Sequence, residues 1–177
     1  MKIAMKFFVG HIIEGEAGIY HEKITRTISE KFGTAPIHLK LPPHITIVPP
    51  FEWQDERQVK EALKDAASDS VGGSFNMAGF DHFSTGTIFV AVVPSLSMQN
   101  TFQIINNRFR IFNDYNMRGR NYIPHAAVAR FLTGGQFSAI WDFLEDEDPV
   151  FRSEFNKVTL FGRMPGGWEI LSEEMLR

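Results

Sequence analysis

Apolar and polar residues along the chain follow first a strand-like and then a helix-like pattern. Residues 3–13 are apolar and rich in strand-forming side chains, which predicts a strand. Residues 16–31 place apolar side chains at intervals of four or five, which favours a helix that ends at Gly33. Residues 41–50 form a short β-branched run between two proline pairs and predict a second strand.

The rest of the chain alternates in the same way. A second helix is predicted over 55–68 with Asp55 as its cap, and a third over 96–112, opened by Ser95. A fourth helix runs through Ala139 to Leu144, after a glycine pair. Further strands are predicted over 74–83, 87–93, 122–129, 151–161 and 168–171. The order β-α-β-α-β-β-α-β-α-β-β indicates an α+β fold rather than a doubly wound parallel sheet.

Length and composition narrow the class of protein. A chain of 177 residues with 44% hydrophobic residues is long enough to bury a core without a disulfide or metal. It contains no cysteine, which excludes a disulfide framework, a thiolate zinc site and a cysteine nucleophile. This length suggests a single domain over residues 1–177, either one compact unit or two small lobes that share a core.

Charge is distributed unevenly. The net charge of −3 excludes nucleic-acid binding by bulk positive charge. Five of the ten arginines nevertheless fall between Asn107 and Arg130, whereas residues 131–177 contain nine acids and four bases. The arginine-rich stretch is either a solvated surface or the source of a one-sided positive field that attracts an anionic substrate.

The N-terminal segment reads better as a buried strand than as a targeting signal. Lys6 and His11 interrupt its apolar run, and Glu14 and Glu16 occupy the region where a cleavage site is expected. No apolar stretch approaches the roughly 18 residues that cross a bilayer. We therefore expect a soluble, cytoplasmic protein that does not bind membranes.

Two segments of the chain echo each other. Pro43-His44-Ile45-Thr46-Ile47-Val48 and Pro124-His125-Ala126-Ala127-Val128-Ala129 both consist of Pro-His followed by a short apolar strand. The two histidines are 81 residues apart, close to half the chain length. The repeat suggests two βα-type lobes related by pseudo-symmetry.

The two histidines suit phosphodiester cleavage without a metal. Because side chains alternate along a strand, His44 and Thr46 share one face, as do His125 and Ala127. If the strands lie side by side, a neutral imidazole takes a proton from the attacking oxygen and a protonated one gives a proton to the leaving oxygen. A hydroxyl two residues after each histidine, and Arg130, would contact the phosphate oxygens.

These segments resemble the two signature tetrapeptides of the two-histidine phosphoesterases, which include the RNA 2′,3′-cyclic phosphodiesterases, also called 2′-5′ RNA ligase-like proteins. The family pattern is His, any residue, Thr or Ser, apolar, occurring twice. The resemblance covers most of the chain. It implies a bilobal α+β fold in which pseudo-symmetric lobes of antiparallel sheet with flanking helices enclose a central cleft. It also implies metal-independent hydrolysis of a cyclic or 2′-5′ phosphodiester, with both histidines in the cleft.

Ala127 departs from this pattern, because the family has Thr or Ser there and a methyl group cannot donate a hydrogen bond. Losing one such donor costs about 10²–10³ in kcat. The departure leaves three readings open: a weaker enzyme, a site kept only for binding, or another donor such as Arg130 or a water.

Other residues draw simpler interpretations. His11, His21, His38 and His82 lack the spacing of a zinc motif and are read as structural or surface residues. Asp81-His82 lacks the Gly-x-Ser-x-Gly elbow that a serine triad needs. Three aromatic residues flank the two motifs and suit either core packing, the better reading for any one of them, or stacking on a base: Phe51, Tyr122 and Phe131.

The prediction is a monomeric phosphoesterase with no cofactor and no metal, acting on a small nucleotide or RNA-end phosphodiester, most simply a 2′,3′-cyclic one. His44 and His125 are the predicted catalytic residues, and Thr46 and Arg130 the predicted substrate-binding residues. The alternative is a nucleotide- or RNA-binding module of the same fold whose turnover is weak or lost.

Overall fold

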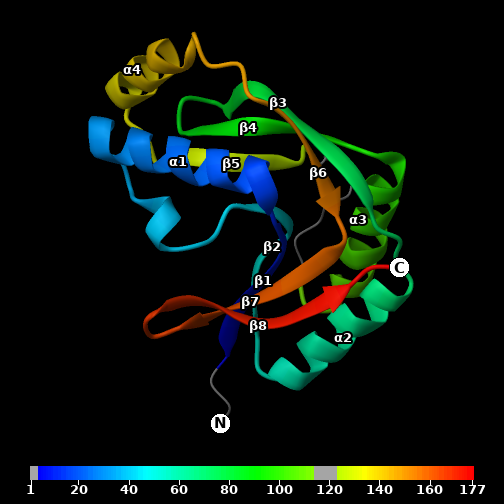
Figure 1. Cartoon of the computed structure of the whole chain (residues 1–177). Coiled ribbons are helices and arrows are strands. Elements are labelled where there is room, and N and C mark those ends of the chain that lie inside the picture. The colour runs from blue at the N-terminus through cyan, green and yellow to red at the C-terminus, as the bar shows by residue number, and fades with distance from the viewer. Residues whose placement is uncertain (1–3, 114–122) are drawn as a thin grey trace.

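The computed structural model describes residues 4–113 and 123–177 and contains two four-stranded antiparallel sheets (Figure 1). In chain order the elements are β1 (Met5–Ile12), α1 (Gly15–Phe32), the 3₁₀ helix η1 (Ile37–Leu39), β2 (His44–Trp53), α2 (Glu56–Ser68), β3 (Gly73–Phe83), β4 (Thr87–Pro94), α3 (Leu96–Phe109), β5 (His125–Arg130), α4 (Gly134–Leu144), β6 (Val150–Phe155), β7 (Lys157–Met164) and β8 (Gly167–Met175). The predicted α+β class is confirmed.

Each sheet forms the centre of one lobe. The first lobe has strand order β2-β1-β7-β8 and is covered by α2. The second has order β5-β4-β3-β6 and is covered by α1, with α4 packed beside α1. Helix α3 contacts strands of both lobes. Figure 1 shows α1 leaving the first lobe after β1 and lying beside β5 of the second. The chain therefore crosses between the lobes early, and α1 ties them together.

The helix ends follow the local sequence signals. Gly33 ends α1 in the left-handed conformation with φ at 64°, which a glycine adopts without a Cβ clash. The side chains of Asp55 and Ser95 cap α2 and α3 by accepting backbone N–H bonds. Thr133 begins α4 with a reciprocal capping box to Gln136.

The predicted single strand over 151–161 is wrong. Strand β6 ends at Phe155 and β7 begins at Lys157, and the two belong to different sheets. Phe155 is buried in the second lobe, whereas Val158 and Leu160 are buried in the first. The apolar alternation changes phase at the polar pair Asn156-Lys157, from odd positions at Phe151 and Phe155 to even positions at Val158 and Leu160, and the prediction of one strand overlooked this change.

Other predicted element boundaries differ less from those in the structure. Strand β2 continues through Pro49-Pro50 because it is an edge strand, where a missing N–H disrupts no ladder, and its pairing with β1 shifts register there. Helix α3 ends at Phe109 rather than 112, and the last strand extends to Met175. Tyr122, predicted to begin the fifth strand, lies outside the described residues.

The buried core runs through both lobes without interruption. At the junction the imidazole of His11 on β1 meets Phe75 and Phe155 of the second lobe edge to face, with ring centroids 5.6 and 5.1 Å apart. The two sheets therefore share one buried core. In the described parts of the chain, no helix has the length and apolar character needed to span a bilayer.

Candidate active site

His44 and His125 occupy equivalent places in the two lobes. Each is the first residue of an edge strand, β2 or β5, and these two edge strands contact each other where the lobes meet. The strands are therefore not neighbours in one sheet, as they would be in a simple side-by-side arrangement, but meet as the edges of two sheets. The pseudo-symmetry predicted from the repeat is confirmed at this level.

The same backbone contact orients both imidazoles. Nδ1 of His44 lies 2.9 Å from the carbonyl oxygen of Pro42, and Nδ1 of His125 lies 2.8 Å from that of Ile123. A carbonyl only accepts, so Nδ1 carries the proton in each ring and donates it. The neutral form of each histidine consequently keeps a free lone pair on Nε2, the atom available for proton transfer.

Aromatic side chains support each imidazole from the two neighbouring strands. The ring of His44 lies 5.5 Å from Phe8 on β1 and 6.1 Å from Phe161 on β7. In the second lobe, His125 lies 5.1 Å from Phe89 on β4 and 4.8 Å from Phe83 on β3. In both lobes the order of strands is histidine, phenylalanine, phenylalanine. These rings restrict the imidazoles sterically and shield them from water.

Burial lowers the pKa of both histidines below 6.5, because desolvation disfavours the charged imidazolium. The positive charge of Arg130 lowers both further, and His125 also lowers the pKa of His44. The two rings are thus within electrostatic reach of each other and of Arg130. Ordinary imidazole pKa values would allow charged and neutral forms to coexist near neutrality, but this site without ligand holds both rings mainly neutral at pH 7.

The positions two residues after each histidine differ in chemistry and in surroundings. Thr46 pairs across the ladder with Gly10, whereas Ala127 pairs with the buried ring of Phe89. A Cβ on Gly10 would lie 3.1 Å from the backbone oxygen of Ile45 and 3.4 Å from the ring of Phe8, so a side chain here would be tightly packed. The hydroxyl stands opposite a glycine in one lobe, and the methyl stands opposite a large ring in the other.

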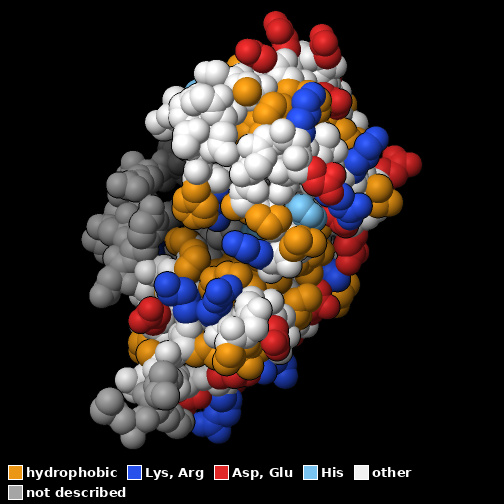
Figure 2. Space-filling view, turned by 90° about the vertical axis from the view of Figure 1, so that its left-hand side faces the viewer, with side chains coloured by type: hydrophobic (Ala, Val, Ile, Leu, Met, Phe, Trp, Pro, Cys, Tyr) orange, Lys and Arg blue, Asp and Glu red, His pale blue; other side chains and the backbone are white. Residues whose placement is uncertain are grey.

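Arg130 is exposed at the end of β5, with its guanidinium 5.2 Å from the ring centroid of Phe131. Among the other arginines of the predicted basic stretch, Arg108 forms ion pairs with Asp65 and Asp69 of α2, and Arg118 and Arg120 lie outside the described residues. Figure 2 shows Lys and Arg side chains across the middle of the face where an upper and a lower lobe meet, among hydrophobic side chains.

A third histidine, His21, is structural, as the sequence predicted, but its contact with β5 was not foreseen. His21 on α1 is buried, and its Nε2 lies 3.0 Å from the carbonyl oxygen of Ala127. It therefore donates a hydrogen bond to β5 beside His125, and the pKa of His21 is lowered to about 4 by burial and by the charge of His44. The helical pattern of 16–31 places His21 on the helix, but only the crossing of α1 to the second lobe brings it to β5.

The pKa of His21 predicts a pH-dependent stability. The unfolded chain binds a proton at this histidine below pH 6.5 while the folded chain does not until about pH 4, so the folded state loses about 3 kcal/mol as the pH falls through this window. His21→Gln keeps an N–H donor but does not titrate. Urea unfolding at pH 7.5 and 4.5 should show a smaller loss of stability in the variant, and an equal loss in both proteins would contradict this assignment.

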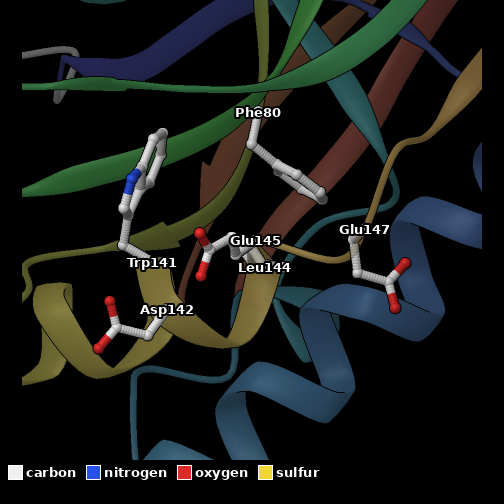
Figure 3. A pocket seen from close by; sticks show the side chains of 6 residues that line it. All are labelled: Phe80, Trp141, Asp142, Leu144, Glu145 and Glu147. Carbon is white, nitrogen blue, oxygen red and sulfur yellow. The ribbon is translucent and has the colours of Figure 1, made fainter.

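A hollow elsewhere on the molecule is chemically unsuited to a phosphodiester. It lies on the side of α4 in the second lobe, where Trp141 and Phe80 stand beside carboxylates (Figure 3). Its acidic lining residues are Asp142, Glu145 and Glu147. Since these groups would repel an anion, the histidine site is the better candidate. Within residues 4–113 and 123–177, no group of three or more His, Asp or Glu side chains is arranged to hold a metal ion.

The sequence profile of the 2′-5′ RNA ligase superfamily matches residues 18–166, which include both Pro-His strands. The chain belongs to the 2′-5′ RNA ligase superfamily. Comparison with curated protein sequences finds no match. Among solved structures, the chain is similar to TT0787 of Thermus thermophilus, with a TM-score of 0.68 and 12% identity, covering 98% of each chain. It is also similar to E. coli LigT complexed with 3′-AMP, with a TM-score of 0.64 and 11% identity, covering 98% of this chain and 99% of LigT.

Membership of the 2′-5′ RNA ligase superfamily confirms the resemblance inferred from the two Pro-His strands, and the structural similarities confirm the bilobal fold. At 11% and 12% identity, these similarities concern the fold alone. The aromatic residues near the motifs separate into two kinds: Phe51 is buried in the core, whereas Phe131 is exposed for 82% of its surface. Core packing is therefore the wrong reading for Phe131.

Proposed function

We propose that this member of the superfamily hydrolyses a cyclic or 2′-5′ phosphodiester on a nucleotide or RNA end, most simply a 2′,3′-cyclic phosphate, without a metal. The observation that carries the proposal is the matched pair of imidazoles. His44 and His125 begin facing edge strands, each donates its Nδ1 proton to the carbonyl two residues earlier, and each therefore keeps Nε2 for chemistry. Two such groups supply the base and the acid that the reaction needs.

The proposed reaction opens the cyclic phosphate with one water. One neutral imidazole takes a proton from the water at Nε2 while the water oxygen bonds to phosphorus. The bond from phosphorus to the ribose 3′ oxygen breaks, and the second, protonated imidazole gives its proton to that oxygen. The product carries a 2′-phosphate and a 3′-hydroxyl. Arg130 and Thr46 stabilise the charge that builds on the nonbridging oxygens.

Binding of the anionic substrate allows one of the two histidines to act as the general acid. With both pKa values lowered by burial and by Arg130, neither ring holds a second proton well in the empty site. A negatively charged phosphodiester between them favours the imidazolium form and raises the pKa of the ring that becomes the acid. The complexes of E. coli LigT with 3′-AMP and with phosphate support an anionic ligand of this kind.

The test of this proposal is hydrolysis of nucleoside 2′,3′-cyclic phosphates as a function of pH. We expect a bell-shaped dependence of kcat/KM with its maximum below pH 6.5, because both free-enzyme pKa values are lowered. The kcat profile should lie at higher pH, because the bound phosphate raises the pKa of the acid. Excess EDTA should leave the rate unchanged. A profile without an acidic limb, or complete loss of activity with EDTA, would rule out the mechanism.

The alternative function is a nucleotide- or RNA-binding module with weak or lost turnover. Ala127 favours it, since this position lacks the hydroxyl that Thr46 supplies in the other lobe and stands opposite the buried Phe89. Both proton-transfer groups are retained, and for that reason we place hydrolysis first. Tight binding of a nucleoside 2′-phosphate without turnover of any cyclic phosphate would identify the module.

A further inference from the structure

Phe131 combines exposure with an unfavourable backbone conformation. It directly follows Arg130 at the end of β5, and 82% of its surface is exposed. Its φ is 59°, in the left-handed region that residues with a Cβ rarely adopt. Neither feature favours folding, because the ring buries little apolar surface and the backbone is strained. Strain of this kind clusters at ligand-binding sites, so Phe131 is a candidate for contact with a ligand.

The surroundings of Phe131 hold its backbone beside the proposed phosphate site. The N–H of the next residue, Leu132, donates to the carbonyl of Gly86 over 3.2 Å, which ties this turn to the hairpin between β3 and β4. Phe83 of the same hairpin packs edge to face on His125. The guanidinium of Arg130, whose charge reaches both His44 and His125, lies over the phenyl ring.

We propose that Phe131 is a stacking platform for the nucleobase attached to the scissile phosphodiester, an inference that rests on the proposed function. A single ribose separates the base of a nucleotide from its phosphate. The ring of Phe131 contacts the guanidinium of Arg130, which is proposed to bind the phosphate, so the ring is within reach of the base of the same nucleotide. The contact with Arg130 indicates that the ring can receive a flat, delocalised group on its face.

Stacking of this kind sets the class of substrate rather than its sequence. Every nucleobase has a π face, so stacking on a phenyl ring tolerates all four bases, with purines favoured by their larger overlap. The inferred preference is for cyclic phosphates that carry a base over those that do not. Phe131 acts on binding and not on proton transfer, so its effect belongs in KM.

The experiment compares adenosine 2′,3′-cyclic phosphate with glycerol 1,2-cyclic phosphate, which has the same reactive ring but no base. Three variants are matched: Phe131→Tyr keeps the ring, Phe131→Leu keeps an apolar side chain and the strained backbone, and Phe131→Gly removes both. The ratio of the two kcat/KM values should fall about tenfold for Leu and Gly through KM, and stay near that of the natural chain for Tyr. Phe131→Gly should also have an equal or higher Tm, since glycine adopts this φ freely.

Two outcomes separate this inference from the proposed function. If the chain hydrolyses both substrates and Phe131→Gly leaves their ratio unchanged, the stacking platform is overturned and the hydrolase stands. If neither substrate is turned over, the proposed hydrolase activity is wrong. Calorimetry with adenosine 2′-monophosphate and inorganic phosphate then tests the stacking platform separately. Weaker nucleotide binding in Phe131→Gly but not in Phe131→Tyr, with phosphate binding unchanged, supports the platform. Equal nucleotide affinity in the variants, or no nucleotide binding at all, overturns it.

Discussion

Replacing either His44 or His125 by alanine should lower kcat for nucleoside 2′,3′-cyclic phosphate hydrolysis by about 10²–10⁴, because each change removes one proton-transfer group. The double variant should lose little more than the worse single variant, because the acid and the base act in one step. Steady-state kinetics at the pH optimum would measure both effects. We expect KM to change much less than kcat, since the phosphate contact proposed for Arg130 is unaltered.

His82→Ala is the matched control for these variants. His82 is exposed on the second lobe, where its ring packs against Phe137 and Trp141 at centroid distances of 5.0 Å. Its removal deletes an imidazole, the ring contacts with α4 and a hydrogen bond to the carbonyl of Ser84, but no group assigned to the proposed chemistry. Activity should therefore stay at the level of the natural chain. A loss in His82→Ala equal to that in His44→Ala would show that the measured losses report on folding rather than on proton transfer.

Ala127→Thr should raise kcat by tenfold or more, because it adds a hydrogen-bond donor where the pseudo-symmetric strand has Thr46. One donor to a developing oxyanion typically contributes about 10²–10³ in kcat. We expect only tenfold as the lower bound because the new methyl group can press on Phe89, which pairs with position 127 across the ladder. Initial rates on a nucleoside 2′,3′-cyclic phosphate, with the same protein concentration for each variant, would measure the gain.

Ala127→Val separates the hydroxyl from the added volume. Valine has nearly the shape of threonine and the same preference for strands, but it donates no hydrogen bond. It should show no gain in kcat. An equal rise in Val and Thr variants would mean that volume beside Phe89 reorients His125, and the missing donor would then be irrelevant. Zero turnover in the natural chain and in Ala127→Thr, with tight nucleotide binding in both, would favour the binding module.

Local sequence signals were sufficient where the physics is local. The left-handed end of α1 at Gly33 and the caps of α2 and α3 depend on residues within one turn of the helix, so each could be predicted from its neighbours. In each of the two Pro-His strands, the alternation of side chains shows which residues share a face with the histidine. Membership of the superfamily followed from these motifs and their spacing, and the sequence profile confirmed it.

Long-range placement was beyond the reach of these signals. The break between β6 and β7 moves the chain from one sheet to the other across Asn156. A change of phase in the apolar alternation marks the break, but local sequence does not say that the next strand joins a different sheet. The lowered pKa values of His44 and His125 arise from burial and from Arg130, and so depend on the folded environment. Whether an aromatic residue after a strand is core or surface likewise depended on its neighbours in space, as Phe51 and Phe131 show.

The sequence by itself therefore determined the kinds of helix and strand, most of their ends, and the pair of histidines with its missing hydroxyl at Ala127. Only the tertiary structure decided that the histidines begin two edge strands that face each other, that α1 crosses to bring His21 beneath β5, and that Phe131 stands in solvent beside Arg130. The physical reason is the distance along the chain over which each interaction acts. Backbone preferences and caps act over one or two turns of chain, whereas burial, electrostatic coupling and strand docking join residues about a hundred positions apart.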